Sequence, residues 1–147
     1  MKAPALDLPA DGGGRVSLQA LNGPAVVYFY PKDDTAGCTR EAQDFTALAP
    51  EFAALGVTVI GVSKDTVAKH ERFKAKHGLN VILASDEDGA ACEAWGVWVE
   101  KTLYGRKYMG IERATFLVDA DGLIRRAWRK VSVKGHAQEV LEAARAL

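Results

Sequence analysis

The chain has 147 residues, 48% of them hydrophobic, which suits one globular domain with a substantial core, and we expect a single domain over residues 1–147. Nineteen basic and nineteen acidic side chains cancel, which argues against attraction to nucleic acid or to an anionic membrane. Two cysteines are too few for a secreted disulfide framework. No secretory signal or membrane-spanning run is present, so we expect a soluble, cytoplasmic protein.

The glycine run at 12–14 is the first feature that could bind a ligand. A phosphate-binding glycine loop leads from a strand into a helix, whereas the strand-like residues 16–18 follow here. The run therefore predicts a flexible hairpin turn.

Two nearly continuous apolar runs, at 25–30 and 57–63, are typical of strands covered on both faces. Between them, apolar residues recur at helical spacing from Phe45 to Leu55, and Gly56 stands at the position of a C-terminal cap. The pattern predicts a helix over 38–55 that connects two parallel strands.

The next segment predicts a helix at about 66–76 and a short strand at 81–84. A further helix carries Cys92 and Trp95, and either Ser85 or Asp86 can cap its start.

The last third predicts an antiparallel hairpin of strands 114–118 and 123–128, joined by the turn-forming residues 119–122. A final helix from Gly135 should pack on the sheet through Val140, Leu141 and Ala144. The fold class is therefore α/β, with a central mixed sheet that is parallel in its first half and antiparallel in its second.

Cys38 is the residue with the clearest chemical potential. It follows the apolar strand at 25–30 and opens the predicted helix. A helix N-terminus carries partial positive charge and free N–H groups, and both favour a thiolate over a thiol. Cys38 is therefore a candidate nucleophile.

The pattern Pro31-x-x-x-Thr35-x-x-Cys38 resembles the active-site signature of peroxiredoxins, and more closely that of the bacterioferritin comigratory protein, or Q-type, branch. Further matches in that branch's order and spacing are Tyr28-Phe29-Tyr30-Pro31-Lys32-Asp33, Gly37-Cys38-Thr39-x-Glu41-Ala42, Val62-Ser63-x-Asp65, Leu83-Ala84-Ser85-Asp86, Trp95-Gly96-Val97, Tyr104-Gly105 and Gly110-Ile111-Glu112-Arg113-Ala114-Thr115-Phe116-Leu117.

This resemblance covers roughly residues 25–130 and implies a thioredoxin-like fold. It also implies an enzyme that reduces hydrogen peroxide and organic hydroperoxides with an external thiol reductant, such as thioredoxin, glutaredoxin or glutathione. We expect neither a cofactor nor a metal.

The residues themselves support this chemistry. Breaking an O–O bond needs an aligned thiolate and donors for the charge that develops on the leaving oxygen. Cys38 supplies the sulfur, and the Thr35 hydroxyl can both donate to and accept from a peroxide. Pro31 lacks an N–H and fixes its own φ, so we expect it to shape the loop and shield the sulfur.

A permanent cation is also needed, because an exposed helix end stabilises an anion by only about 0.3–1 kcal/mol. The resemblance implies that Arg113 is this cation. Its planar guanidinium could stabilise the thiolate and polarise the peroxide together. Glu41 also matches a family position. It either orients the arginine or is simply a carboxylate favoured in the first turn of a helix.

Cys92 bears on how the oxidised enzyme recovers. The resemblance implies that a resolving cysteine would stand at position 43 or near position 74, where this chain has Gln43 and Lys74. We therefore expect a one-cysteine cycle, with Cys92 a core residue. Were Cys92 to resolve the sulfenic acid instead, substantial local unfolding would be needed. The lack of an extended C-terminal arm favours a monomer.

Other candidates have simpler interpretations. His70 and His77 lie seven apart among charged residues, which predicts a solvated helix face rather than a metal site. Trp95 and Trp98 are each expected either in the core or in an active-site wall. The main alternative function is a redox-regulated binding or sensor protein without multiple turnover, because a dithiol exchanger would need Cys-x-x-Cys.

Overall fold

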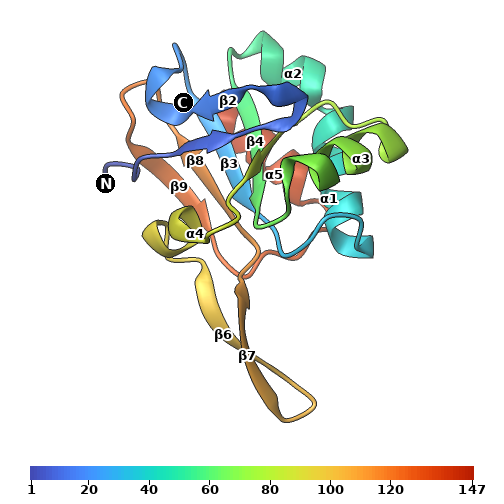
Figure 1. Cartoon of the computed structure of the whole chain (residues 1–147). Coiled ribbons are helices and arrows are strands. Elements are labelled where there is room, and N and C mark those ends of the chain that lie inside the picture. The colour runs from blue at the N-terminus through green and yellow to red at the C-terminus, as the bar shows by residue number, and fades with distance from the viewer.

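A five-stranded mixed sheet forms the centre of the protein, and helices flank it (Figure 1). The computed structural model describes all residues, 1–147. In spatial order the strands are β5 (Ile82–Ser85), β4 (Thr58–Ser63), β3 (Ala25–Phe29), β8 (Ala114–Val118) and β9 (Ile124–Trp128). β3, β4 and β5 are parallel, whereas β8 is antiparallel to both of its neighbours. The predicted division into a parallel and an antiparallel half is confirmed.

The pleat of β3 divides the core into two parts. Ala25, Val27 and Phe29 belong to one buried apolar cluster, whereas Val26 and Tyr28 belong to the other. Successive side chains of a strand point to opposite faces, so these two clusters lie on opposite sides of the sheet.

The face that carries Tyr28 is covered by α1 (Ala36–Ala47), α2 (Ala49–Ala54), α3 (Val67–His77) and α5 (His136–Arg145). The prediction of a single helix over 38–55 is wrong, because two helices cover this range. α1 ends before Leu48, and α2 begins after it. Pro50 stands in the first turn of α2, where its missing N–H does no harm but where it could not continue an unbroken helix.

The opposite face is covered by α4 (Ala90–Ala94) and by the N-terminal hairpin of β1 (Asp7–Pro9) and β2 (Arg15–Ser17). The glycine run lies between these two strands, so the predicted hairpin turn is confirmed. A short 3₁₀ turn at Leu18–Ala20 follows β2.

A second hairpin projects from the body, formed by β6 (Trp98–Leu103) and β7 (Arg106–Ile111) (Figure 1). Its turn residues, Tyr104 and Gly105, both have positive φ, as in the tight turns that match strand twist. Sequence reasoning missed this element because most of its side chains are exposed, so no alternating buried face marks it. None of the protein's helices has both the length and the apolar character that crossing a bilayer requires.

Candidate active site

Cys38 is the third residue of α1, at the end of the loop that leaves β3. Its side chain is buried, with 2% exposed. Thr35 occupies the N-cap position, yet its side chain accepts no hydrogen bond from the helix. The positive end of α1 therefore has no side-chain cap to offset it, and it lies beside the sulfur.

Arg113 holds the second positive charge against this sulfur. It stands between β7 and β8, and its Nη2 donates to Cys38 Sγ at 3.3 Å while its Nη1 donates to Glu41 Oε1 at 2.7 Å. The guanidinium also rests against Gly37, where an added Cβ would lie 3.2 Å from Nη2. A residue without a side chain is therefore favoured immediately before the cysteine.

Glu41 lies one helical turn beyond Cys38 and is buried, with 1% exposed. Burial raises the pKa of Glu41 to about 7, although the charge and hydrogen bond of Arg113 act in the opposite direction. Burial alone would lower the pKa of Arg113, but Glu41 and Cys38 together raise it. Arg113 is thus a permanent cation whose planar guanidinium contacts the Glu41 carboxyl group through one nitrogen and the Cys38 sulfur through another.

Thr35 and Pro31 lie on the loop before the helix, and both side chains are exposed. The Thr35 hydroxyl donates to the carbonyl oxygen of Lys32 at 2.9 Å, and no hydrogen bond joins it to Cys38. Its proton is therefore engaged, whereas its lone pairs remain free to accept a proton donor. Of the five residues predicted for the site, the structure joins Cys38, Arg113 and Glu41 by direct contacts and places Thr35 and Pro31 on the adjoining loop.

Comparison with known proteins agrees with this geometry. Residues 1–127 match the model of the AhpC/TSA family. The chain belongs to the peroxiredoxins. It is 50% identical over 141 residues to a protein named putative peroxiredoxin bcp from Coxiella burnetii, and the match covers 95% of this chain and 93% of that protein. It is 48% identical over 149 residues to peroxiredoxin Bcp from Xanthomonas campestris, covering 99% and 93%.

Solved structures of such proteins share the fold of this peroxiredoxin. The bacterioferritin comigratory protein of Xanthomonas campestris, studied for alkyl peroxide reduction, superposes with a TM-score of 0.91 at 48% identity, covering 96% of this chain and 90% of that one. A PrxQ from Xylella fastidiosa gives a TM-score of 0.92 at 40% identity, covering 99% and 96%. The predicted branch and the thioredoxin-like fold are confirmed. The protein is a thiol-dependent peroxidase, and its reaction takes a peroxide and a thiol reductant.

Cys92 lies in the other part of the peroxiredoxin's core and is fully buried. Cys38 belongs to the cluster on the opposite face of the sheet, and both cysteines are free thiols. Burial first, and the Asp86 carboxylate second, raise the pKa of Cys92 well above its usual range. This position fits the predicted core role.

His70 is not on a solvated face, so that prediction is wrong. It is fully buried in this peroxiredoxin, with its Nδ1 2.6 Å from Asp33 Oδ2 and its Nε2 2.9 Å from the carbonyl oxygen of Ala84. His77, seven residues on, contacts Asp34 at the surface. The buried Phe73 lies three residues beyond His70, and this spacing on one helix face could have indicated that His70 points inward.

The two tryptophans near the hairpin have different environments. Trp95 is buried and packs against Phe29 and Phe116. Trp98, at the base of the hairpin, is half-buried under the ammonium group of Lys64, which lies 4.3 Å from its ring centroid. Trp95 is therefore a core residue, as one of the two expectations had it.

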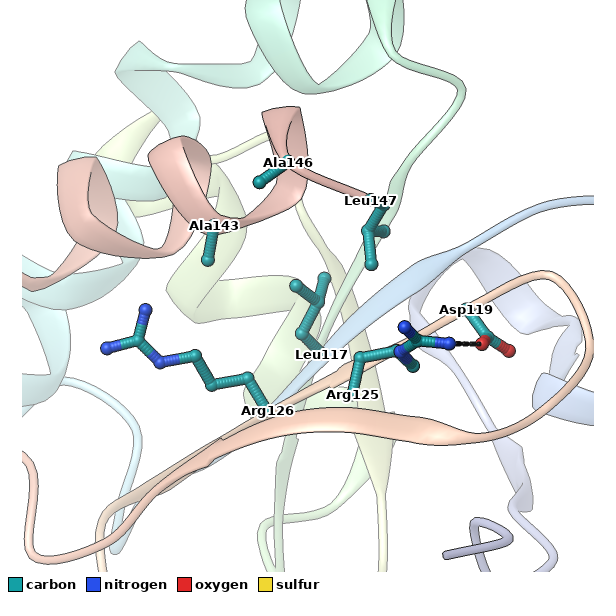
Figure 2. A pocket seen from close by; sticks show the side chains of 7 residues that line it. All are labelled: Leu117, Asp119, Arg125, Arg126, Ala143, Ala146 and Leu147. Carbon is teal, nitrogen blue, oxygen red and sulfur yellow. Dashed lines mark hydrogen bonds and ion pairs between the residues drawn. The ribbon is translucent and has the colours of Figure 1, made fainter.

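A cavity of about 350 Å³ lies between β9 and α5 (Figure 2). Leu117, Ala143, Ala146 and Leu147 form its apolar part, and Arg125 and Arg126 project from the edge strand beside it. None of the residues around Cys38 lines this cavity. The chemistry of this peroxiredoxin is therefore expected at the start of α1 rather than here.

Proposed function

We propose that Cys38 is the peroxidatic cysteine. Its thiolate attacks one peroxide oxygen, the S–O bond forms as the O–O bond breaks, and the sulfur is oxidised to a sulfenic acid. The second oxygen leaves as water or an alcohol after taking a proton. The observation that carries this proposal is the Arg113 guanidinium, which contacts the Cys38 sulfur and is fixed by Glu41.

Thr35 and Arg113 divide the work of holding the peroxide. Because the Thr35 proton is committed to Lys32, the free lone pairs of its oxygen accept the O–H proton of the incoming peroxide. Arg113 donates to the oxygens as negative charge builds on the leaving group. Pro31 fixes the start of the loop that presents Thr35.

Glu41 serves as a positioning residue for Arg113. The contact of 2.7 Å engages one end of the guanidinium, and the other end faces the sulfur at 3.3 Å. Of the two interpretations left open by the sequence, the one in which Glu41 orients the arginine is supported by this contact.

The cycle then closes with thiols from outside the chain. A first thiol condenses with the sulfenic acid, releasing water and leaving a mixed disulfide. A second thiol then attacks the reductant sulfur of this mixed disulfide, which releases Cys38 as a thiol and leaves the two reductant thiols joined in a disulfide. The position of Cys92 across the sheet supports this one-cysteine cycle, since a direct bond would require the cysteine Cα atoms to come within about 7 Å.

The wider setting is proposed on the same basis. Hydrogen peroxide and organic hydroperoxides are the substrates, and thioredoxin, glutaredoxin or glutathione is the reductant. The protein acts as a one-domain monomer in the cytoplasm, without nucleic acid or membrane as partner.

Peroxide consumption with several thiol donors tests the cycle. Wild type and Cys92→Ser should turn over repeatedly with at least one donor, whereas Cys38→Ser should be inactive while keeping the thermal unfolding midpoint of a folded protein. Retained turnover in Cys38→Ser would refute the assignment. Loss of turnover in a folded Cys92→Ser would refute the one-cysteine cycle.

A further inference from the structure

One peptide group in the active-site loop is held at both of its ends. The N–H of Asp33 donates to Asp65 Oδ2 at 2.8 Å, and the carbonyl oxygen of Lys32 accepts from the Thr35 hydroxyl at 2.9 Å. These two groups belong to the same planar peptide unit. Whatever fixes the N–H therefore also fixes the acceptor that turns the Thr35 hydroxyl.

The side chain of Asp33 anchors this peptide a second time. Its Oδ1 accepts from the Tyr30 hydroxyl at 2.5 Å, and its Oδ2 lies 2.6 Å from His70 Nδ1. His70 Nε2 faces the carbonyl oxygen of Ala84, which can only accept, so Nε2 carries a hydrogen. One proton then joins Nδ1 to Asp33, and both carboxyl oxygens of Asp33 are engaged.

Asp65 is fixed in turn by serines from two strands. The Ser63 hydroxyl donates to Asp65 Oδ2 at 2.6 Å, and the Ser85 hydroxyl donates to the Asp65 carbonyl oxygen at 2.5 Å. All these residues are buried. A network that starts at the ends of β4 and β5 and at α3 thus converges on the peptide beside Thr35.

We propose that Asp33, His70 and Asp65 are positioning residues for peroxide reduction, which fix the Lys32–Asp33 peptide group and through it the direction of the Thr35 hydroxyl. The proposal rests on the role of Thr35 proposed above. No member of the network hydrogen-bonds to Cys38, Glu41 or Arg113, so the network acts on the proton-accepting side of the site and not on the cation.

A double-mutant cycle tests this route of action, with kcat/KM for hydrogen peroxide as the readout. Thr35→Val should lower kcat/KM about a hundredfold, because it removes the group that accepts the peroxide proton. Asp33→Ala should lower it about tenfold in the wild-type background. In the Thr35→Val background, Asp33→Ala should cost less than twofold, because its effect passes through Thr35.

A conservative substitution separates geometry from charge. In Asp33→Asn, the amide oxygen can still accept from Tyr30, and the amide nitrogen can donate to Nδ1 of a neutral His70. Asp33→Asn should therefore recover most of the activity that Asp33→Ala loses. His77→Gln is the matched control, because this half-buried histidine on the same helix contacts Asp34 rather than the network, and the kcat/KM of this variant should stay within twofold of wild type.

The dependence of Cys38 alkylation on pH provides a second readout, measured in the Cys92→Ala background. Asp33→Ala should leave its midpoint unchanged, because Arg113 and the start of α1 are untouched.

Four results would overturn the proposal. Losses that multiply in the double variant, or a shifted alkylation midpoint, would show a general structural effect. An undiminished kcat/KM in Thr35→Val would refute the proposed role of Thr35 itself, which identifies that failure separately. If Asp33→Ala does not fold, the same double-mutant cycle is run with Ser63→Ala, which removes only the hydroxyl that donates to Asp65. Ser63→Ala should then lower kcat/KM by less than Asp33→Ala would, and this loss should disappear in the Thr35→Val background. A loss of kcat/KM that persists in the Thr35→Val background would refute the network.

Discussion

The two cysteines occupy the same position in their helices, yet their surroundings are opposite. Cys38 is the third residue of α1 and Cys92 is the third residue of α4. At α4, the Asp86 carboxylate accepts from the N–H groups of Ala91 at 3.1 Å and of Cys92 at 2.8 Å. At α1 no side chain caps the helix, and the guanidinium of Arg113 faces the sulfur instead.

From this difference we expect that a helix start does not by itself make a thiol reactive. An anion at the N-terminus offsets the partial charge that would otherwise stabilise a thiolate, whereas a cation adds to it. The two cysteines thus have similar backbone positions but opposite charges beside them, with the Asp86 carboxylate near Cys92 and the Arg113 guanidinium near Cys38. This contrast between the two sites leads to four testable expectations.

The largest effect concerns which bond the oxidised protein can form. One equivalent of hydrogen peroxide added to the reduced protein should give a sulfenic acid on Cys38 and no internal disulfide, because the sheet separates the two sulfurs. Intact mass, with and without a sulfenic acid trapping reagent, distinguishes the two products. A loss of two hydrogens that depends on Cys92 would contradict the one-cysteine cycle.

Removing the cation beside Cys38 should have the next largest effect. Arg113→Met should lower kcat/KM by about 10²–10³, the usual cost of losing one donor to a developing oxyanion. Arg113→Lys should recover only part of this, since an ammonium group cannot contact Glu41 and the sulfur in the same fork. Arg129→Met is the control, because this exposed arginine pairs with Glu112 and should have little effect. Equal losses of kcat/KM in Arg113→Met and Arg129→Met would contradict the proposed role of Arg113 in the reaction.

Glu41 should make stability depend on pH near neutrality. Its pKa is raised by burial from 4.5 to about 7, so the folded protein binds this proton more tightly than the unfolded chain. The free energy of unfolding should therefore fall by up to about 3 kcal/mol as pH rises from about 4.5 to about 7. Urea unfolding across this range should show that slope in wild type and in the control Glu51→Gln, but not in Glu41→Gln. An unchanged slope in Glu41→Gln would exclude Glu41 as its source.

The smallest effect should come from removing the negative charge of Asp86 beside Cys92. Asp86→Asn in a Cys38→Ala background should speed alkylation of Cys92 only several-fold, because burial, the larger cause of its raised pKa, remains. Asp88→Asn, which alters the cap at Ala90 only, should change nothing. A rise of a hundredfold in Asp86→Asn, at unchanged thermal stability, would show that charge rather than burial keeps Cys92 inert.

Much of the fold could be predicted because its signals are local. Apolar runs mark β3 and β4 as buried strands, and Thr66 and Gly78 bound α3 as caps. The β6–β7 hairpin could not be predicted in this way, because exposed strands carry no burial pattern. The break at Leu48 could have been predicted from Pro50, whose effect on a helix is also local.

The site divides along the same line. Cys38 and Thr35 could be predicted from one short stretch of chain, whereas Arg113 lies 75 residues from Cys38 and only resemblance brought it to the site. The buried partners of Asp33 could not be predicted, because His70 and Asp65 are polar residues of types that usually lie at the surface. Only the tertiary fold buries them. Long-range polar contacts leave no periodic mark in a sequence.

The sheet that lies between the two cysteines also bears on how the enzyme would respond to a sudden rise in peroxide. In the proposed one-cysteine cycle no second sulfur of the chain is within reach, so each oxidised molecule would wait for a thiol to arrive by diffusion. The rate of peroxide removal would then follow the supply of reductant rather than the supply of peroxide. When reductant is scarce, the sulfenic acid would remain exposed to a second peroxide, and further oxidation to the sulfinic acid would inactivate the molecule. By separating the two cysteines, the sheet would thus make the fraction of active enzyme depend on the ratio of peroxide to reductant to which the protein has been exposed.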